Sequence, residues 1–345
     1  MNFEDLIGVK LPVIQAPMAG VQDLSLALAV SRAGGLGSLP CASLSMEQIE
    51  THLETIKHAT DKPINLNFFC HQTPEKNLSA EKKWLNILKP YFDELKIDPE
   101  SIAPQASRAS FNHEIVDILE PYKPEVISFH FGLPPLDCLA RVKEWGAKIL
   151  SSATTVDEAI WLQDNGVDLI IAQGLEAGGH RGMFLSKNLH SQSDTDTLLL
   201  KILERVTLPV IAAGGISTSN DVARKLNLGA IATQIGTAYL LCDETKTSPL
   251  HRQAIKADKI PQTALTNLFS GRPARGIINR VMNELGPINT NAPEFPTAAI
   301  ALSALRSTAE KNSSSDFSPL WCGKNTEGCA DISAYDLTKE LASNI

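Results

Sequence analysis

Short, continuously apolar segments recur along the chain, and most are followed by a stretch in which apolar residues recur every three or four positions. Continuous apolar character, as opposed to alternation, is typical of parallel strands that are buried on both faces. We therefore predict eight strands of this kind. They span residues 12–16, 36–39, 63–69, 126–131, 148–152, 169–173, 209–213 and 230–235.

The stretches between these strands have the apolar spacing of amphipathic helices. Side chains that favour a helix N-terminus precede several of them, namely Asp23, Ser45, Thr155 and either Ser217 or Ser219. The predicted helices span residues 23–33, 46–59, 111–122, 136–145, 155–165, 197–206 and 219–227.

Eight strand–helix units in succession predict an α/β fold, the (β/α)8 TIM barrel. A doubly wound open sheet is the main alternative for alternating strands and helices. The count of eight units and the lack of an early dinucleotide-binding fingerprint disfavour that alternative.

Two segments exceed the minimal barrel, and both follow predicted strands. Residues 71–110 form a polar insertion with a possible helix at 80–88, and the second segment begins at residue 245. Because insertions after strands lie at the catalytic face of a barrel, we expect both to build a smaller lid or substrate domain. The expected division is a barrel over residues 1–244, a lid over 245–325 and a C-terminal part, 326–345, whose helix docks on the barrel.

The composition of the chain disfavours some classes of binding partner. The chain has 345 residues, of which 43% are hydrophobic, and a net charge of −8 without any basic cluster, which argues against nucleic acid. No apolar run reaches the length of a membrane span. The six cysteines are scattered without a Cys-x-x-Cys pair, which indicates reduced thiols in a cytoplasmic protein. We expect a monomer or a homodimer.

Glycines follow the last two predicted strands. Gly214 and Gly215 come after the seventh strand, and Gln234-Ile235-Gly236-Thr237 closes the eighth. Barrels commonly bind phosphate at these two loops, where glycines let backbone N–H groups approach an anion. Tight turns alone would also explain the glycines. The pair of loops nevertheless favours a phosphate site, without indicating whose phosphate it holds.

A histidine lies in the glycine-rich segment after the sixth strand, Gln173-Gly-Leu-Glu-Ala-Gly178-Gly179-His180-Arg-Gly182. Catalytic residues of barrels occupy such positions, and an accessible imidazole can act as a base or as a cation near neutral pH. A surface histidine without a role is the alternative. We predict that His180 is catalytic.

Residue chemistry also bears on two further kinds of site, one for a flat ring and one for a metal ion. Ala16, Pro17 and Met18 end the first strand, where small residues and a thioether suit a flat ring, although a buried strand end explains them equally well. No His-x-x-x-His or Cys-x-x-Cys spacing occurs, and the glycines between Glu176 and His180 disfavour a helix that would join them, so no metal is expected.

Several motifs, in this order along the chain, resemble the nitronate monooxygenase family, formerly called 2-nitropropane dioxygenase. They are Pro12-Val-Ile-Gln-Ala-Pro-Met-Ala-Gly20, Gly34-Gly-Leu-Gly37, the 173–182 segment, Ala212-Ala-Gly-Gly-Ile216 and Gln234-Ile-Gly-Thr237, with weaker similarity at Gly271-Arg-Pro-Ala-Arg-Gly276 and Leu320-Trp-Cys-Gly323. The FMN-dependent enoyl-acyl-carrier-protein reductases carry a similar Gly-Gly-His loop.

The resemblance implies FMN held without a covalent bond, with His180 as the catalytic base and His130 and Met18 on the substrate side. It implies that the FMN phosphate lies at the two glycine loops and that polar side chains surround the ring and the ribityl chain. The implied cofactor-binding residues are Ala16, Pro17, Met18, Asn67, Gln173, Gly178, Gly179, Gly214, Gly215, Gln234, Ile235, Gly236 and Thr237.

The implied reaction is the oxidation of alkyl nitronates, propionate 3-nitronate among them, by O2 to a carbonyl product and nitrite through a flavin semiquinone. His180 would remove the α-proton of a neutral nitroalkane. An FMN-dependent NAD(P)H reductase acting on an enoyl thioester or a quinone is the alternative. A flavin-free lyase or isomerase is disfavoured because no strand ends in lysine, and a non-catalytic flavin carrier is disfavoured by His180.

The chain departs from the family pattern in two places, and both concern the substrate. The family has tyrosines in its C-terminal segment, whereas residues 293–306 hold Phe295 as their one aromatic side chain. Lys324 stands where the family often has glutamine after the Trp-x-Gly segment. We expect the Lys324 side chain to lie in solvent.

Overall fold

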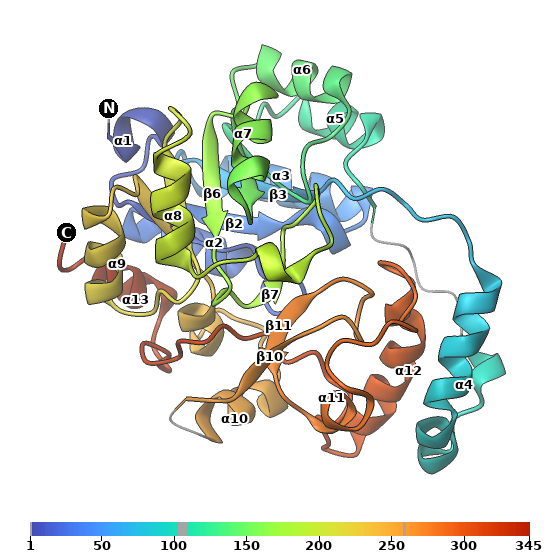
Figure 1. The fold of residues 1–345 in the computed structure, drawn as a ribbon. Coiled ribbons are helices and arrows are strands. Elements are labelled where there is room, and N and C mark those ends of the chain that lie inside the picture. Colours follow the sequence, from blue (N-terminus) through green and yellow to red (C-terminus); the bar gives the residue numbers. More distant parts are fainter. Residues whose placement is uncertain (1, 103–108, 258–259) are drawn as a thin grey trace.

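The computed structural model describes residues 2–102, 109–257 and 260–345. Its central element is a barrel of eight parallel strands in the order β1-β9-β8-β6-β5-β4-β3-β2, and a parallel bridge between Ile14 and Leu36 joins the two ends. All eight predicted strands and the TIM-barrel fold are thereby confirmed (Figure 1). The strands are β1 (Val13–Gln15), β2 (Gly37–Pro40), β3 (Ile64–Phe69), β4 (Val126–His130), β5 (Lys148–Ala153), β6 (Leu169–Gln173), β8 (Val210–Ala213) and β9 (Ala232–Ile235).

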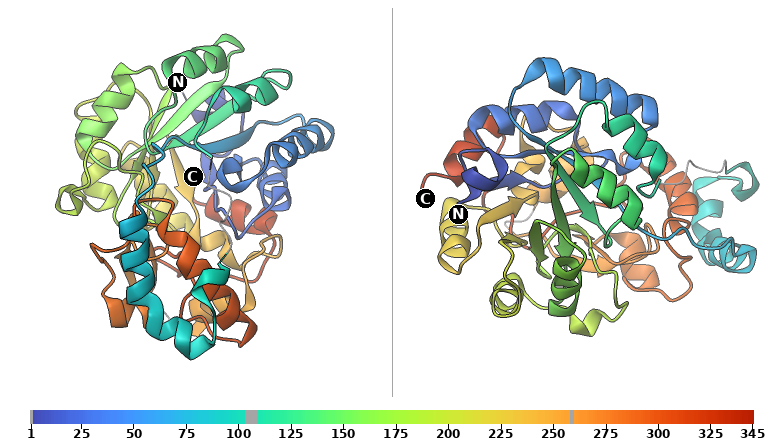
Figure 2. Two further views of the ribbon diagram at one scale, coloured as in Figure 1. Left: turned by 90° about the vertical axis from the view of Figure 1, so that its right-hand side faces the viewer. Right: turned by 90° about the horizontal axis from the view of Figure 1, so that it is seen from above.

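Helices surround this barrel (Figure 2, right). Each predicted helix is present with ends that differ by a few residues. The helices of the barrel are α2 (Leu24–Ala33), α3 (Met46–Ala59), α5 (His113–Leu119), α6 (Leu136–Glu144), α7 (Val156–Asp164), α8 (Thr195–Leu203) and α9 (Ser219–Asn227), and α1 (Phe3–Ile7) precedes β1. Short 3-10 turns are η1 (Cys41–Ser43), η2 (Pro99–Ser101), η3 (Leu189–Ser191) and η4 (Thr237–Leu241).

The residues that cap the helices agree with the predicted ones, with one correction. Asp23, Ser45 and Thr155 each accept a backbone N–H from the first turn of α2, α3 and α7. The cap of α9 is Thr218, and not Ser217 or Ser219, because the carboxylate of Asp221 completes a reciprocal capping box with Thr218.

Apolar side chains fill both sides of the barrel wall. Inside the barrel, Ile14, Leu150 and Ile211 belong to one buried cluster with Phe3 and Ile7 of α1. A larger cluster lies between the outer face of the strands and the helices. Because both faces of the strands are packed, their sequences are continuously apolar.

The helix that follows β3 packs against a helix from the C-terminal part of the chain. Helix α4 (Leu78–Leu95) lies beside α12 (Ala298–Lys311), away from the barrel (Figure 2, left). Trp84 and Leu88 of α4 share a buried cluster with Leu302 and Leu305 of α12. The predicted helix at 80–88 is thus part of a longer one. Helix α11 (Arg280–Leu285) contributes Val281 and Met282 to the same cluster. Helix α10 (Pro249–Ala257) belongs elsewhere, because its Ile255 is buried in a cluster with Leu240 and Leu241 of η4.

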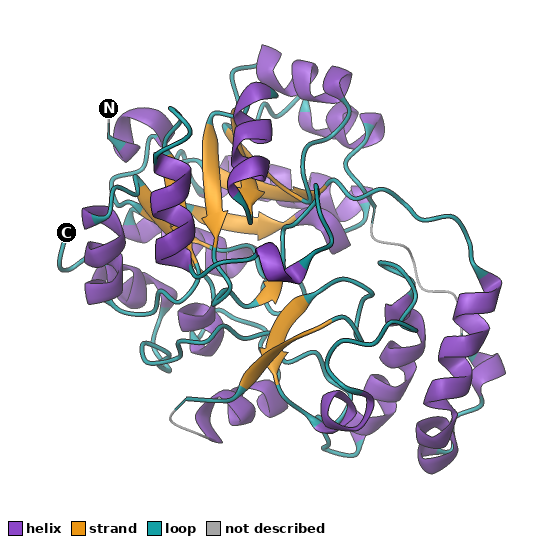
Figure 3. Cartoon of the chain, viewed as in Figure 1, coloured by secondary structure: helices purple, strands orange, loops and turns teal. Residues whose placement is uncertain are grey.

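A second, antiparallel sheet connects this region to the barrel. It consists of β10 (Thr263–Thr266), β11 (Ala274–Ile277) and β7 (Gly179–His180), in the order β10-β11-β7 (Figure 3). The segment predicted as a glycine-rich loop is therefore partly a strand, with His180 opposite Ala274. This pairing fixes the backbone of His180 against residues about 90 positions later in the chain.

The chain ends against the barrel. Helix α13 (Ala334–Leu341) contacts α2 and α9, and Leu337 and Leu341 are buried in the outer cluster. Within the described residues, no helix combines the length and the apolar character needed to cross a membrane.

Candidate active site

A cavity that is partly open to solvent lies where the barrel strands end. Fourteen of the fifteen predicted site residues line it, and they come from six strand ends. These are Ala16, Pro17, Met18, Asn67, His130, Gln173, Gly178, Gly179, His180, Gly214, Gly215, Gln234, Gly236 and Thr237.

Ile235 is the exception. Successive side chains of a strand point to opposite faces, so Gln234 reaches the cavity whereas the Ile235 side chain is buried in the core. The carbonyl oxygen of Ile235 already accepts a hydrogen bond from the backbone N–H of Ala16 at 2.7 Å. Its role in cofactor binding stays a prediction.

The two glycines after β8 are required by their geometry. Gly214 and Gly215 have φ values of 117° and 69°, in the region that side chains disfavour. A Cβ atom on Gly214 would lie 2.9 Å from the backbone nitrogen of Ala177 and from Oγ1 of Thr195. The loop is therefore shaped so that backbone, and not side chains, faces the cavity.

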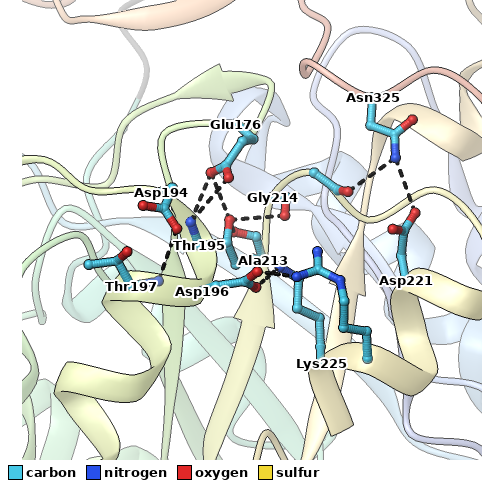
Figure 4. A network of polar contacts seen from close by, with 12 residues as sticks. Glu176, Asp194, Thr195, Asp196, Thr197, Ala213, Gly214, Asp221, Lys225 and Asn325 are labelled. Atoms are coloured by element: carbon cyan, nitrogen blue, oxygen red, sulfur yellow. Dashed lines mark hydrogen bonds and ion pairs between the residues drawn. The ribbon is translucent and has the colours of Figure 1, made fainter. Parts of the chain in front are cut away.

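A carboxylate occupies the start of the neighbouring helix. Glu176 accepts hydrogen bonds from the backbone N–H and the hydroxyl of Thr195, both at 2.9 Å, where α8 begins (Figure 4). Because this helix terminus already holds an anion, the loops at Gly214 and Gly236 are the places left for a phosphate. This role of Glu176 was not expected from the sequence.

Polar side chains point into the cavity from other strands. The amide of Asn67 donates to Oγ of Ser128 at 2.9 Å. The amide of Gln173 donates to the carbonyl oxygen of His180 at 2.9 Å and accepts from the backbone N–H of Gly182 at 2.8 Å. Gln234 differs, because its buried side-chain oxygen has no hydrogen-bond partner among the described residues. It is available to a ligand.

His180 is half-buried within a ring of aromatic side chains. The centroids of Phe69, Phe131, Phe295 and Trp321 lie 5.5–6.2 Å from its imidazole. Its Nε2 atom is 2.8 Å from the hydroxyl oxygen of Ser270, a buried residue that precedes β11. These rings make an apolar wall, in which an ion is poorly solvated and proton transfers are shielded from water.

His130 has both ring nitrogens engaged. Nε2 lies 3.1 Å from the carbonyl oxygen of His180, and Nδ1 lies 3.0 Å from Oγ of Ser152. A carbonyl oxygen only accepts, so Nε2 carries the proton and Nδ1 accepts from the serine. Burial lowers the pKa of His130 to about 4, which keeps the ring neutral at physiological pH. The geometry favours support of the His180 backbone over direct contact with substrate.

Arg181 is fully buried directly beside the catalytic candidate. Its guanidinium donates to the carbonyl oxygens of Gln173 and Gly174, at 2.6 and 2.5 Å, and to Oε1 of Gln192 at 2.8 Å. Burial lowers the pKa of Arg181 to about 9, so it remains a cation near neutral pH. The rigid fork of this side chain fixes the segment between β6 and β7.

Several residues of the cavity were not expected from the sequence. Ser152 is the penultimate residue of β5, and Trp321, Gly323 and Asn325 come from the C-terminal segment. No spacing rule connects residues near 320 with strands near 200, although the short Trp321-to-Gly323 motif gave a weak signal. The side chain of Lys324 is exposed and does not line this cavity.

Potential metal ligands group together at one place among the described residues. Ligand atoms of His113, Asp137 and Cys138 lie within 4.8 Å of one another. His113 and Asp137 are exposed on α5 and α6, and none of the three lines the cavity. This cluster is therefore separate from the candidate active site.

Comparisons with known proteins agree over nearly the whole chain. The sequence model of the family described as nitronate monooxygenase matches residues 2–344. The nitronate monooxygenases of Pseudomonas aeruginosa and Paraburkholderia phytofirmans are each 36% identical, covering 100% and 97% of this chain and 99% and 92% of their own.

Solved structures give the same picture. A nitroalkane oxidase from Streptomyces ansochromogenes superposes with a TM-score of 0.89 at 33% identity, covering 99% of this chain and 96% of that one. FabK from Thermotoga maritima has a TM-score of 0.74 at 23% identity, covering 99% and 94%, which shows a shared fold alone.

Proposed function

Because the chain belongs to the nitronate monooxygenase family, we propose that it oxidises alkyl nitronates with O2 to a carbonyl product and nitrite, using FMN held in the barrel cavity. The family is flavin-dependent in general, and the protein is an oxidoreductase. The observation that carries the proposal is that one cavity joins a histidine in an apolar wall to a glycine cradle.

The residues of the cavity suit a flavin mononucleotide. Gly214, Gly215, Gly236 and Thr237 would hold the phosphate, because two of these glycines have left-handed backbone and no Cβ in the way. The unpartnered oxygen of Gln234 would accept from a ring N–H. Asn67 and Gln173 supply further polar groups, and Ala16, Pro17 and Met18 would lie against the ring.

Bound flavin supplies the acceptor through which electrons pass from the substrate to O2. The chain's own contribution centres on the imidazole of His180, which takes the α-proton of a neutral nitroalkane. The hydroxyl oxygen of Ser270, 2.8 Å from Nε2, can accept a hydrogen bond from that nitrogen, because its own proton is directed at the carbonyl oxygen of Arg272 at 3.3 Å. This contact orients the ring. The cationic ring then attracts the nitronate anion, while the surrounding aromatic side chains exclude water.

Other residues hold this base in place. His130 and Gln173 both donate to the carbonyl oxygen of His180, and Arg181 holds the two carbonyl oxygens before the loop. We assign His130 and Arg181 as positioning residues. Near neutral pH the ring of His130 stays neutral and the guanidinium of Arg181 stays protonated, so neither group exchanges a proton with the substrate. A precise base position matters because a displacement of about 1 Å can cost about 100-fold in rate.

The region outside the barrel is proposed to act as the lid. Residues 71–110 and 245–325 supply α4, α12 and the β10–β11 pair, and β11 lies beside His180. Residues 326–345 carry the docked helix α13. All six cysteines are free thiols, which supports a cytoplasmic location. We propose a monomer or a homodimer.

The test follows O2 consumption by the purified FMN-loaded protein. Alkyl nitronates, with propionate 3-nitronate among them, are compared with NADH and NADPH. We expect rapid uptake of O2 and release of nitrite with a nitronate alone, and no uptake with either nicotinamide. Fast anaerobic bleaching of the flavin by NADH or NADPH, without any response to nitronates, would show a reductase instead.

A further inference from the structure

The C-terminal segment 321–329, here called the strap, connects three barrel loops across the cavity. The backbone N–H of Gly323 donates to Oγ1 of Thr237 at 2.9 Å, and that of Lys324 donates to the carbonyl oxygen of Glu176 at 2.9 Å. The N–H of Gly328 donates to Oγ of Ser217 at 2.6 Å. The strap therefore joins the loops after β6, β8 and β9.

The strap lies against these loops without an intervening side chain. A Cβ atom on Gly178 would lie 2.6 Å from the backbone nitrogen of Gly323, and one on Gly323 would lie 2.7 Å from the carbonyl oxygen of Glu176. A Cβ atom on Gly328 would lie 1.7 Å from the carbonyl oxygen of Ser217. Backbone touches backbone at all three points, so no ligand chain can pass there while the strap is closed.

One side chain fastens the strap to the phosphate loop. Nδ2 of Asn325 donates to the carbonyl oxygen of Gly215 at 3.2 Å and to Oδ2 of Asp221 at 3.1 Å (Figure 4). The same Asp221 carboxylate also accepts from Ser217 and Thr218 at the start of α9. Asn325 thus connects the strap, the glycine cradle and the helix cap in one network, and it lines the cavity.

We propose that the strap sets the length of the flavin that the protein accepts, with Asn325 as the latch. The inference rests on the proposed function, which places the flavin phosphate between Gly215 and Thr237. A mononucleotide ends at that phosphate and fits beneath the strap. A dinucleotide continues into a second phosphate and a nucleoside, which would have to displace the strap and break the contacts at Gly323, Lys324 and Asn325.

The experiment titrates the flavin-free full-length chain with FMN and with FAD, and measures the dissociation rate of each flavin by its fluorescence. The unmodified protein should bind FMN more than about tenfold more tightly than FAD. Asn325→Ala should release FMN about tenfold faster and reduce the preference for FMN over FAD, because it removes a hydrogen bond to a carboxylate. Asn325→Asp, which places a second carboxylate against Asp221, should act in the same direction.

Asn344→Ala is the matched control. Asn344 also donates to the first turn of α9, at Ser219 and Asn220, but it is exposed and lies outside the cavity. It should leave both flavin affinities unchanged. Equal binding of FMN and FAD by the unmodified protein would overturn the inference, as would unchanged release and preference in both Asn325 variants. Binding of neither flavin would reject the proposed function itself, and the inference with it.

Discussion

Two different sets of contacts surround His180, one on its backbone and one on its ring. The carbonyl oxygen accepts from His130 and Gln173, which orient the residue from behind. The ring faces Ser270 and four aromatic side chains, and it lines the cavity. Position and chemistry are thus supplied by separate neighbours, so a substitution of the ring can remove the base while the backbone contacts remain.

Replacement of His180 by asparagine should separate two kinds of substrate. A preformed nitronate has already lost its α-proton, so it needs no base, whereas a neutral nitroalkane does. We expect His180→Asn to retain FMN and to lower kcat/KM for a neutral nitroalkane by about 100-fold or more, with a much smaller loss for the nitronate.

The matched control for this substitution is His190→Asn. His190 is exposed on η3, later in the same connection between β6 and α8. It should leave both substrates unaffected. An equal loss on nitroalkane and nitronate in His180→Asn would contradict the assignment of His180 as the base.

At the scale of elements, the region outside the barrel is held together by helices that are distant in sequence. α4 follows the third strand, α12 follows the last, and their apolar faces meet around Leu88 and Leu305. Arg280 of α11 strengthens the arrangement with two hydrogen bonds to the carboxylate of Glu94 on α4, at 2.7 and 2.8 Å. The region outside the barrel is therefore one packed unit formed by two insertions.

Truncation of Leu88 should test that packing. Leu88 is fully buried, and Leu88→Ala should lower the free energy of unfolding by about 2–5 kcal/mol through lost burial and a residual cavity. Leu78, on the same helix, is 64% exposed. Leu78→Ala should therefore change the free energy of unfolding by less than about 0.5 kcal/mol. Chemical denaturation measures both, and similar values for the two variants would contradict the proposed packing.

The strands of the barrel follow from the sequence, whereas the contacts that complete the site do not. Continuous apolar runs and glycine-rich strand ends mark β8 and β9 locally, so their place in the barrel can be predicted. The pairing of β7 with β11, and of α4 with α12, depends on surfaces that meet only after folding. Trp321 to Gly323 gave a weak sequence signal, but Asn325 belongs to no motif, so its contacts with Gly215 and Asp221 could not be predicted.

At the scale of the whole molecule, two histidines with lowered pKa values connect stability to pH. Burial lowers the pKa of His130 and of His251 from 6.5 to about 4. Between these values the unfolded chain binds a proton at each histidine and the folded chain does not. Stability should therefore be highest above about pH 6.5, fall as the pH decreases and level off below about pH 4, at a cost on the order of 3 kcal/mol per histidine.

Melting temperatures between pH 7.5 and 4.5 measure this effect. The unmodified protein should lose stability steeply over that range, and the double variant His130→Gln, His251→Gln should show a shallower slope, whatever its stability at pH 7.5. His58→Gln, at a histidine whose side chain is 79% exposed, should keep the original slope. Parallel slopes for the double variant and the unmodified protein would contradict the assignment.

The pairing of the first and last barrel strands, β1 and β9, determines when the barrel can close during synthesis. Val13 of β1 pairs with Thr233 of β9, which is made about 220 residues later, and the strap is made later still. A ribosome adds roughly 5–20 residues per second, so β1 waits on the order of 10 s before β9 has been synthesised. The cavity has no complete wall during synthesis, because a chain that ends before residue 321 lacks the strap. If the cavity holds the flavin, as proposed, the cofactor is expected to bind only to the finished polypeptide.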